Sequence, residues 1–271
     1  MESSDWGDTL NFEKPRALNY KIHQAEPKIM PFIVKILNTK LPILEDGTIP
    51  EPVERILLFT NAIFLKSEFA KQSFHIIETC YKKYARILEE KLVAINPKEF
   101  FPALKEIESL LFELGSILDF FAREINLALK LGFNWKNVSF PKVVKTCQKK
   151  YPDELLTKKL AEFTHSKFYI YFRNMRNRIT HRLPFIIKGR NDKIFFPDDP
   201  ENDNANPQTE DQIDLFETSK EWLYKILTFV DQNSIIVFKK IVRINATNTE
   251  TGEKIDIEHY FKREQFVTNE E

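Results

Sequence analysis

The chain has 271 residues, and its 40 basic residues balance its 40 acidic ones. An apolar fraction of 42% with 30% charged residues is typical of a globular protein with a substantial core, and the neutral total excludes a protein coated all over in positive charge for nucleic-acid binding. Two cysteines, Cys80 and Cys147, with no CxxC pair exclude a disulfide framework and a cysteine-based zinc site, and fit a reducing compartment.

The first residues, "MESSDWGDTLNFEKP", contain no basic stretch followed by an apolar one, and no later segment approaches the roughly 18 apolar residues of a membrane span. We therefore expect a cytoplasmic protein without a membrane anchor. Prolines punctuate the N-terminal segment, residues 1–52, so we expect an irregular N-terminal arm with at most one short helix near "FIVKILN": Pro15, Pro27, Pro31, Pro42, Pro50 and Pro52.

Four long helices are predicted after the arm. Six glycines in the whole chain and long proline-free stretches favour helices over a many-turned β fold. Apolar residues recur every three or four positions over 53–93, which predicts one helix or two in series. Helices are also predicted over 102–131, ended by Gly132, over 152–183, ended before Pro184, and over 212–230.

The segments between these helices are predicted to be short connections, hairpins and loops. "KVVKTCQKK" falls in a short connection, and "FIIKGRNDKIFF" predicts a small hairpin about Gly189. The acidic stretch over 197–211 predicts a long loop. Two strands about a polar turn are predicted over 239–261.

The fold class that follows is mainly α: an antiparallel helical bundle with an irregular N-terminal arm and a small C-terminal β-hairpin. We expect three regions, namely the arm (1–52), the bundle with the core (53–233) and the C-terminal hairpin and tail (234–271).

The stretch "RNMRNRITHR", residues 173–182, stands out in a neutral chain because it concentrates arginines around one histidine. On a helix, Phe172 and Met175 fall on an apolar face, and Arg173 and Asn177 fall on the opposite side. Arg176 and His181 are five residues apart, so they point about 140° away from each other. One helix cannot bring both to one small group, but two copies related by a two-fold axis would line a shared cleft.

This set of side chains suits RNA cleavage. The guanidinium of Arg176 would hold the scissile phosphate and balance its growing charge. The imidazole of His181 would take or return a proton near neutral pH, and its place in the last helical turn favours the imidazolium. Attack by the 2′-hydroxyl of the substrate needs neither a protein nucleophile nor a metal, and it restricts the substrate to RNA.

The hexapeptide "RNRITH" resembles the ribonuclease motif of the HEPN superfamily, in which arginine precedes histidine by four to six intervening residues and a polar residue often follows the arginine. The resemblance implies a bundle that dimerises and a metal-independent endoribonuclease of a divergent bacterial branch, in a toxin–antitoxin or phage-defence role. It implies a catalytic pair, Arg176 and His181, supported by Asn177. We expect Arg173, Arg178 and Arg182 to bind RNA, and we expect no metal and no cofactor.

Other interpretations stay open at this stage. The arginine-rich face is also that of an ordinary solvated helix. A catalytically silent HEPN-like dimer that binds a nucleotide or a partner protein is the main alternative, and an antitoxin or a nucleotidyltransferase is the expected kind of partner for a toxin. Asp119 and Arg123 predict an intrahelical ion pair, with the lesser alternative that Asp119 orients a motif residue across the bundle.

Overall fold

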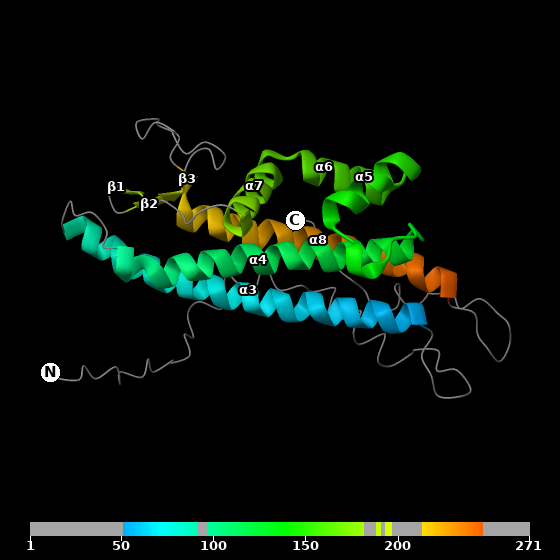
Figure 1. The fold of residues 1–271 in the computed structure, drawn as a ribbon, viewed down its shortest axis with the longest axis horizontal. Helices are drawn as coiled ribbons and strands as arrows, with labels where there is room; N and C mark the ends of the chain where they lie inside the picture. Colours follow the sequence, from blue (N-terminus) through cyan, green and yellow to red (C-terminus); the bar gives the residue numbers. More distant parts are fainter. Residues whose placement is uncertain (1–50, 91–96, 182–187, 191–192, 197–212, 246–271) are drawn as a thin grey trace, which may run out of the picture.

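The computed structural model describes residues 51–90, 97–181, 188–190, 193–196 and 213–245 (Figure 1). Residues 1–50 of the predicted N-terminal arm and the acidic loop therefore lie outside the described residues, and residues 51 and 52 already belong to a helix. In the described part the chain forms six α-helices, one short 3₁₀ helix and three short strands, in the order α3 (Glu51–Glu90), α4 (Pro97–Ala128), η2 (Trp135–Asn137), α5 (Phe140–Lys150), α6 (Leu155–His165), α7 (Lys167–His181), β1 (Lys188–Arg190), β2 (Lys193–Phe196), β3 (Ile213–Asp214) and α8 (Leu215–Asn245).

Three long helices, α3, α4 and α8, lie side by side and form the body of the fold (Figure 1). The shorter helices α5, α6 and α7 cover α4 and α8 and carry the chain back along the bundle. Because of this return, α4 and α8 run in the same direction and only α3 runs opposite to them. The prediction of a mainly α bundle is confirmed, but its long helices are not all antiparallel.

The apolar stripe of α4 forms the centre of the core. Its members at three- and four-residue spacing are almost fully buried, and they contact the equivalent stripes of α3 and α8: Ile107, Leu111, Leu114, Leu118, Phe121 and Ile125. Pro102 lies inside this helix and not at its start, since the helix already begins at Pro97. Gly132, with φ of 83°, follows the end of the helix as predicted.

The prediction that "KVVKTCQKK" lies in a connection is wrong, because this segment forms most of α5. Ser139 precedes the helix, Pro141 lies in its first turn, and its apolar residues share one buried face: Phe140, Val143, Val144 and Cys147. The apolar residues of this segment have helical spacing over only two turns, and the lysines around them made the sequence resemble a polar connection.

The prediction of a single helix over 152–183 is also wrong, because the chain forms two helices, α6 and α7, separated at Ser166. Ser166 adopts an extended conformation (φ −67°, ψ 142°). Its hydroxyl accepts a hydrogen bond from the backbone N–H of Tyr169 at 3.2 Å, which caps the new helix α7. The axis of α7 is thereby free to differ from that of α6.

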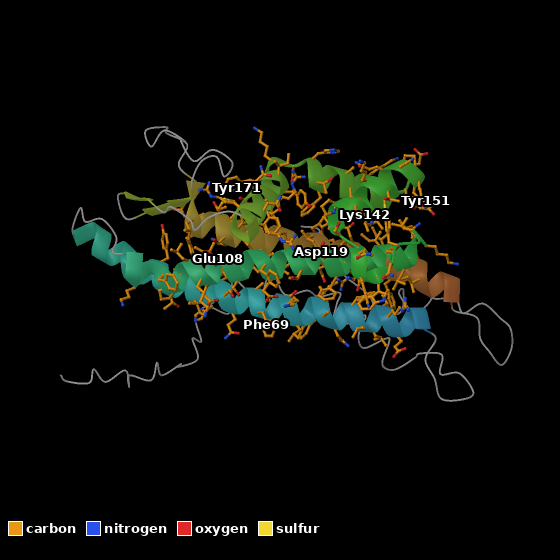
Figure 2. The ribbon with its side chains drawn as sticks, viewed as in Figure 1. Phe69, Glu108, Asp119, Lys142, Tyr151 and Tyr171 are labelled. Atoms are coloured by element: carbon orange, nitrogen blue, oxygen red, sulfur yellow. The ribbon has the colours of Figure 1, made fainter. Side chains whose placement is uncertain are left out.

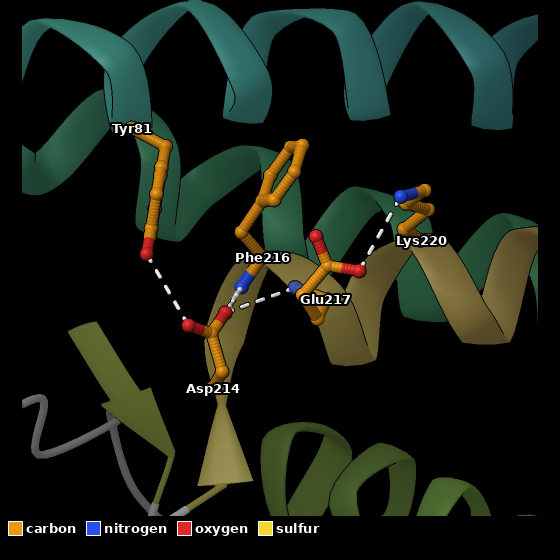
Figure 3. Close-up of polar contacts among 5 residues, drawn as sticks. All are labelled: Tyr81, Asp214, Phe216, Glu217 and Lys220. Atoms are coloured by element: carbon orange, nitrogen blue, oxygen red, sulfur yellow. Dashed lines mark hydrogen bonds and ion pairs between the residues drawn. The ribbon is translucent and has the colours of Figure 1, made fainter. Parts of the chain in front are cut away.

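The last helix, α8, is longer than predicted. Its first turn is capped by Asp214, whose Oδ1 accepts the backbone N–H groups of Phe216 and Glu217, both at 2.9 Å (Figure 3). The Tyr81 hydroxyl donates to the other oxygen, Oδ2, at 3.3 Å, and so ties the cap to α3.

At its other end α8 continues to Asn245, so the strand predicted from residue 239 is wrong over 239–245. Val237, Phe238 and Ile241 are buried at helical spacing, and their packing outweighs the strand preference of the β-branched run. The rest of that predicted hairpin, over 246–261, lies outside the described residues.

A small antiparallel sheet joins the start of α8. Gly189 of β1 pairs with Ile194 of β2, and Phe196 of β2 pairs with Ile213 of β3. The predicted hairpin therefore exists, but Gly189 lies within a strand and the reversal falls two residues later. None of the helices in the described ranges has the length and the apolar character needed to cross a membrane.

Candidate functional site

Helix α7 carries the arginine–histidine motif on the surface of the bundle. Tyr169, Phe172 and Met175 are buried against the rest of the core, while Arg173 and Asn177 are exposed. The backbone is helical through His181, so the separation of about 140° between Arg176 and His181 about the helix axis holds.

The Arg176 guanidinium is seated against α4. Its Nη2 lies 3.4 Å from Oδ2 of Asp119, and the two side chains keep 32% and 26% of their surface exposed. Under the side chain lies Gly115, where an added Cβ would stand 2.6 Å from Cζ and 2.8 Å from Cδ of Arg176. Only a residue without a side chain lets the arginine approach α4 this closely.

Asp119 connects three helices through its two oxygens. While Oδ2 faces Arg176 of α7, Oδ1 accepts the backbone N–H of Phe140, in the first turn of α5, at 2.9 Å. Figure 2 shows Asp119 on the side of α4 that faces these two helices. The carboxylate therefore fixes the start of α5 and the position of the guanidinium at once.

Tyr169 lies one and two turns before Arg173 and Arg176 on the same helix. Burial raises the pKa of its phenol to about 12, an effect that Arg173 and Arg176 oppose and Asp119 reinforces. These electrostatic contributions indicate that all four groups share one environment. At neutral pH the phenol keeps its proton, so Tyr169 contributes a neutral hydroxyl beside two cations.

The other motif residues differ in their surroundings. Arg178 is buried, with 6% of its surface exposed, because it lies within about 60° of Met175 around the helix. Arg178 therefore has little exposed surface with which to contact RNA. The side chain of His181 and the whole of Arg182 lie outside the described residues.

One residue of the site, Gly115, was not predicted. Asp119 was expected first to pair with Arg123, but the carbon of the Arg123 guanidinium lies 4.6 Å from the Phe120 ring centroid. The lesser alternative, that Asp119 orients a motif residue across the bundle, agrees with its 3.4 Å contact with Arg176. A sequence signal did exist, since Gly115 interrupts the middle of a long helix four residues before Asp119. A glycine there indicates a close approach by another element.

The described residues contain no group of three or more histidine, cysteine, aspartate or glutamate side chains arranged to hold a metal ion. Within these residues the site consists of a cation, Arg176, held by a carboxylate, with a neutral phenol and an exposed arginine nearby. Such a set binds and neutralises an anionic group.

Residues 106–242, about half of the chain, match the family of Cthe2314-like HEPN domains. The chain belongs to the HEPN superfamily. The match runs from the first third of α4 to the last turn of α8, and it includes Asp119, Arg176 and His181. Comparisons with curated proteins and with solved structures gave no match.

Membership explains the architecture of long and short helices and agrees with a nucleotide-binding or ribonuclease type of function. For this HEPN chain the arrangement adds one feature to the motif itself: the motif arginine is held from beneath by a glycine and an aspartate of α4. Three helices of the match, α4, α5 and α7, meet at that aspartate.

Proposed function

We propose that this HEPN protein is a metal-independent endoribonuclease of the cytoplasm that acts on RNA as a homodimer. The observation that carries the proposal is the position of Arg176, whose guanidinium is fixed by Asp119 and Gly115 and still keeps 32% of its side-chain surface exposed. A fixed, partly exposed guanidinium is suited to stabilise charge on a phosphate without reorganising during the reaction.

In the proposed reaction the ribose 2′-hydroxyl attacks the adjacent phosphorus, and the bond to the 5′-oxygen of the next nucleotide breaks. Arg176 balances the charge on the non-bridging oxygens, and His181 transfers the proton to the leaving 5′-oxygen or takes it from the 2′-hydroxyl. The products are a 2′,3′-cyclic phosphate and a 5′-hydroxyl. Asn177 supports the pair, and Arg173 and Arg182 bind neighbouring phosphates.

The proposal requires a dimer because Arg176 and His181 of one helix point about 140° apart. Two α7 helices that meet across a two-fold axis would bring an arginine and a histidine from both chains to one cleft. Mixing Arg176→Ala chains with His181→Ala chains tests this arrangement. Heterodimers, counted by native mass spectrometry, should regain part of the cleavage that each homodimer lacks, and heterodimers without cleavage would contradict a shared cleft.

The direct test is cleavage of labelled RNA by the purified protein in excess EDTA. We expect cleavage by the wild type and none by Arg176→Ala or His181→Ala, with unchanged helix content by circular dichroism. Lys158→Ala, at an exposed position on α6, is the matched control and should cut like the wild type. Full activity in either motif variant would refute the assignment.

One observation favours a second candidate function. Arg176 is already paired with Asp119, which is also what a catalytically silent dimeric bundle that binds a nucleotide or a partner protein would need for stability alone. A dimer that cuts no RNA at any pH from five to eight supports this alternative. If cleavage is found, we propose a toxin–antitoxin or phage-defence role, with an antitoxin or a nucleotidyltransferase as the partner to seek.

A further inference from the structure

A second site is formed by a cavity of about 360 Å³ at one end of the bundle. It lies where α3 begins and where α4 and α8 end, and these ends come together in Figure 1. Its walls combine three basic side chains with three aromatic ones: Arg55, Arg123, Lys130, Phe59, Phe133 and Trp135. None of the described residues that line it is acidic.

Arg123 is the most distinctive of the cations. Its guanidinium carbon lies 4.6 Å from the ring centroid of Phe120 and 5.9 Å from that of Phe59, so ring faces hold it in place. Its Nε is buried, and within the described part of the chain it has no hydrogen-bond partner. The ring faces thereby hold the positive charge of Arg123 at the wall of the cavity, where it would attract an anion that enters.

Two of the rings that line the cavity, Trp135 and Phe133, each lie close to a further lysine. Trp135 is 46% exposed, and Nζ of Lys136 lies 5.4 Å from its ring centroid. Nζ of Lys142 lies 4.7 Å from the ring centroid of Phe133. Stacking surfaces interleaved with positive charge are the recurring arrangement by which proteins bind single-stranded nucleic acid.

The segment that carries these rings is fixed in position. The amide of Asn126, on α4, donates to the carbonyl of Phe133 at 3.0 Å and accepts its N–H at 3.1 Å. Before it, Lys130 and Gly132 adopt left-handed backbone conformations, with φ of 49° and 83°. Glycine adopts this conformation freely, but lysine does so at a cost, so the turn that directs Lys130 toward the cavity is held against a local preference.

We propose that this cavity binds one nucleotide of a single-stranded RNA, with the base stacked on Trp135 and its phosphates bound by Arg123 and Lys130. Bases of a duplex are paired and stacked on one another, so they are not available to Trp135. The choice of RNA over DNA rests on the proposed ribonuclease function. Asp119 and Arg123 are one helical turn apart on α4, so the strand would continue from this cavity toward Arg176.

The test is binding of a short fluorescein-labelled single-stranded RNA to the full chain, measured by anisotropy over a range of salt concentrations. All variants carry Arg176→Ala, so that the RNA stays intact. Adding Trp135→Ala should weaken binding about ten-fold, since loss of one stacked base has an effect of this size. Adding Arg123→Gln with Lys130→Gln should lower the slope of log K against log salt by about 1.4, because two phosphate contacts are lost.

Two control variants match these changes at the far end of α4. Lys105→Gln removes one exposed positive charge roughly 35 Å from the cavity, and Phe101→Ala removes an exposed aromatic ring. Both should bind RNA like their parent. Melting curves check that each variant is folded.

The proposal is overturned if the cavity variants bind RNA like the controls, if an RNA duplex binds as tightly and with the same dependence on Trp135, or if adenosine monophosphate displaces the RNA at equal concentration. That last result would identify a site for free nucleotides. Cleavage is measured separately with Arg176 intact. Trp135-dependent binding without cleavage would contradict the ribonuclease proposal and leave this one standing.

Discussion

Gly115→Ala is the smallest perturbation that reaches the site, because it adds one methyl group beneath the motif arginine. A Cβ at position 115 would lie 2.6 Å from Cζ and 2.8 Å from Cδ of Arg176. Non-bonded heavy atoms need about 3.5 Å, so these two carbons must retreat by roughly 0.8 Å, and Nε of Arg176, which lies nearest to the added Cβ, must retreat farther. The guanidinium would leave its position 3.4 Å from Asp119.

The expected effects on stability and on cleavage differ in size. Alanine within a helix is about 1 kcal/mol more favourable than glycine, and loss of a partly exposed ion pair costs about 0 to 1 kcal/mol. The free energy of unfolding should therefore stay within about 1 kcal/mol of the wild-type value. A displacement of about 1 Å in a catalytic group lowers a rate by roughly a hundred-fold, so cleavage should be almost lost from a stable protein.

Urea unfolding and the RNA cleavage assay, run on the same preparation, measure the two effects. Ser116→Ala, at the adjacent position on α4, is the matched control because its hydroxyl bonds only within the helix, to the Phe112 carbonyl at 2.9 Å. It should leave both quantities near the wild-type values. Wild-type cleavage by Gly115→Ala would refute the idea that the close approach to α4 positions Arg176 for catalysis.

Three further predictions concern neighbouring parts of α4. Asp119→Asn keeps an acceptor for the Phe140 N–H but removes the charge that faces Arg176, so cleavage should fall about ten-fold or more with helix content unchanged by circular dichroism. Burial raises the pKa of Glu124 to about 8, against the lowering effect of a hydrogen bond from Thr60, so the folded chain keeps a proton that the unfolded chain releases near pH 4.5. This contribution to stability is complete below pH 4.5 and is lost as the pH rises through 8. Between pH 6 and pH 8 the free energy of unfolding, measured with urea, should fall by about 2 kcal/mol. An equal fall in Glu124→Gln would contradict the assignment. Phe121→Ala, in the fully buried stripe, should lower the free energy of unfolding by about 3 to 5 kcal/mol, and a loss below 1 kcal/mol would show that the core closes over the gap.

The long helices could be predicted because each carries its own apolar stripe, which repeats over many turns. The same reasoning failed where a helix is short or where tertiary packing decides its end. The apolar face of α5 spans only Phe140–Cys147, and its lysines resemble a polar connection. The end of α8 contains β-branched residues that favour a strand until Phe238 and Ile241 find partners in the core.

The site residues, like the helices, could be predicted where the signal is local and not where it depends on packing. The motif residues were visible because their spacing is local and fixed by the helix. Their partner, Asp119, was predicted only as a lesser alternative, because the side chain of α4 that faces α7 depends on how the two helices pack. The break at Ser166 sets that packing, and no periodicity in the sequence marks it. Gly115 was the one local sign of the contact.

The positions that violate local preferences are therefore the informative ones. Gly115 weakens a helix that alanine would strengthen, and Lys130 holds a backbone conformation that glycine adopts more easily. Each lies beside a basic group that is held by its surroundings, namely Arg176 in the first case and Arg123 in the second. The extended apolar stripes of α3, α4 and α8 supply enough stability for both local costs. Local stability alone favours neither residue, so both are the sequence signs of the two anion-binding sites that we propose along α4.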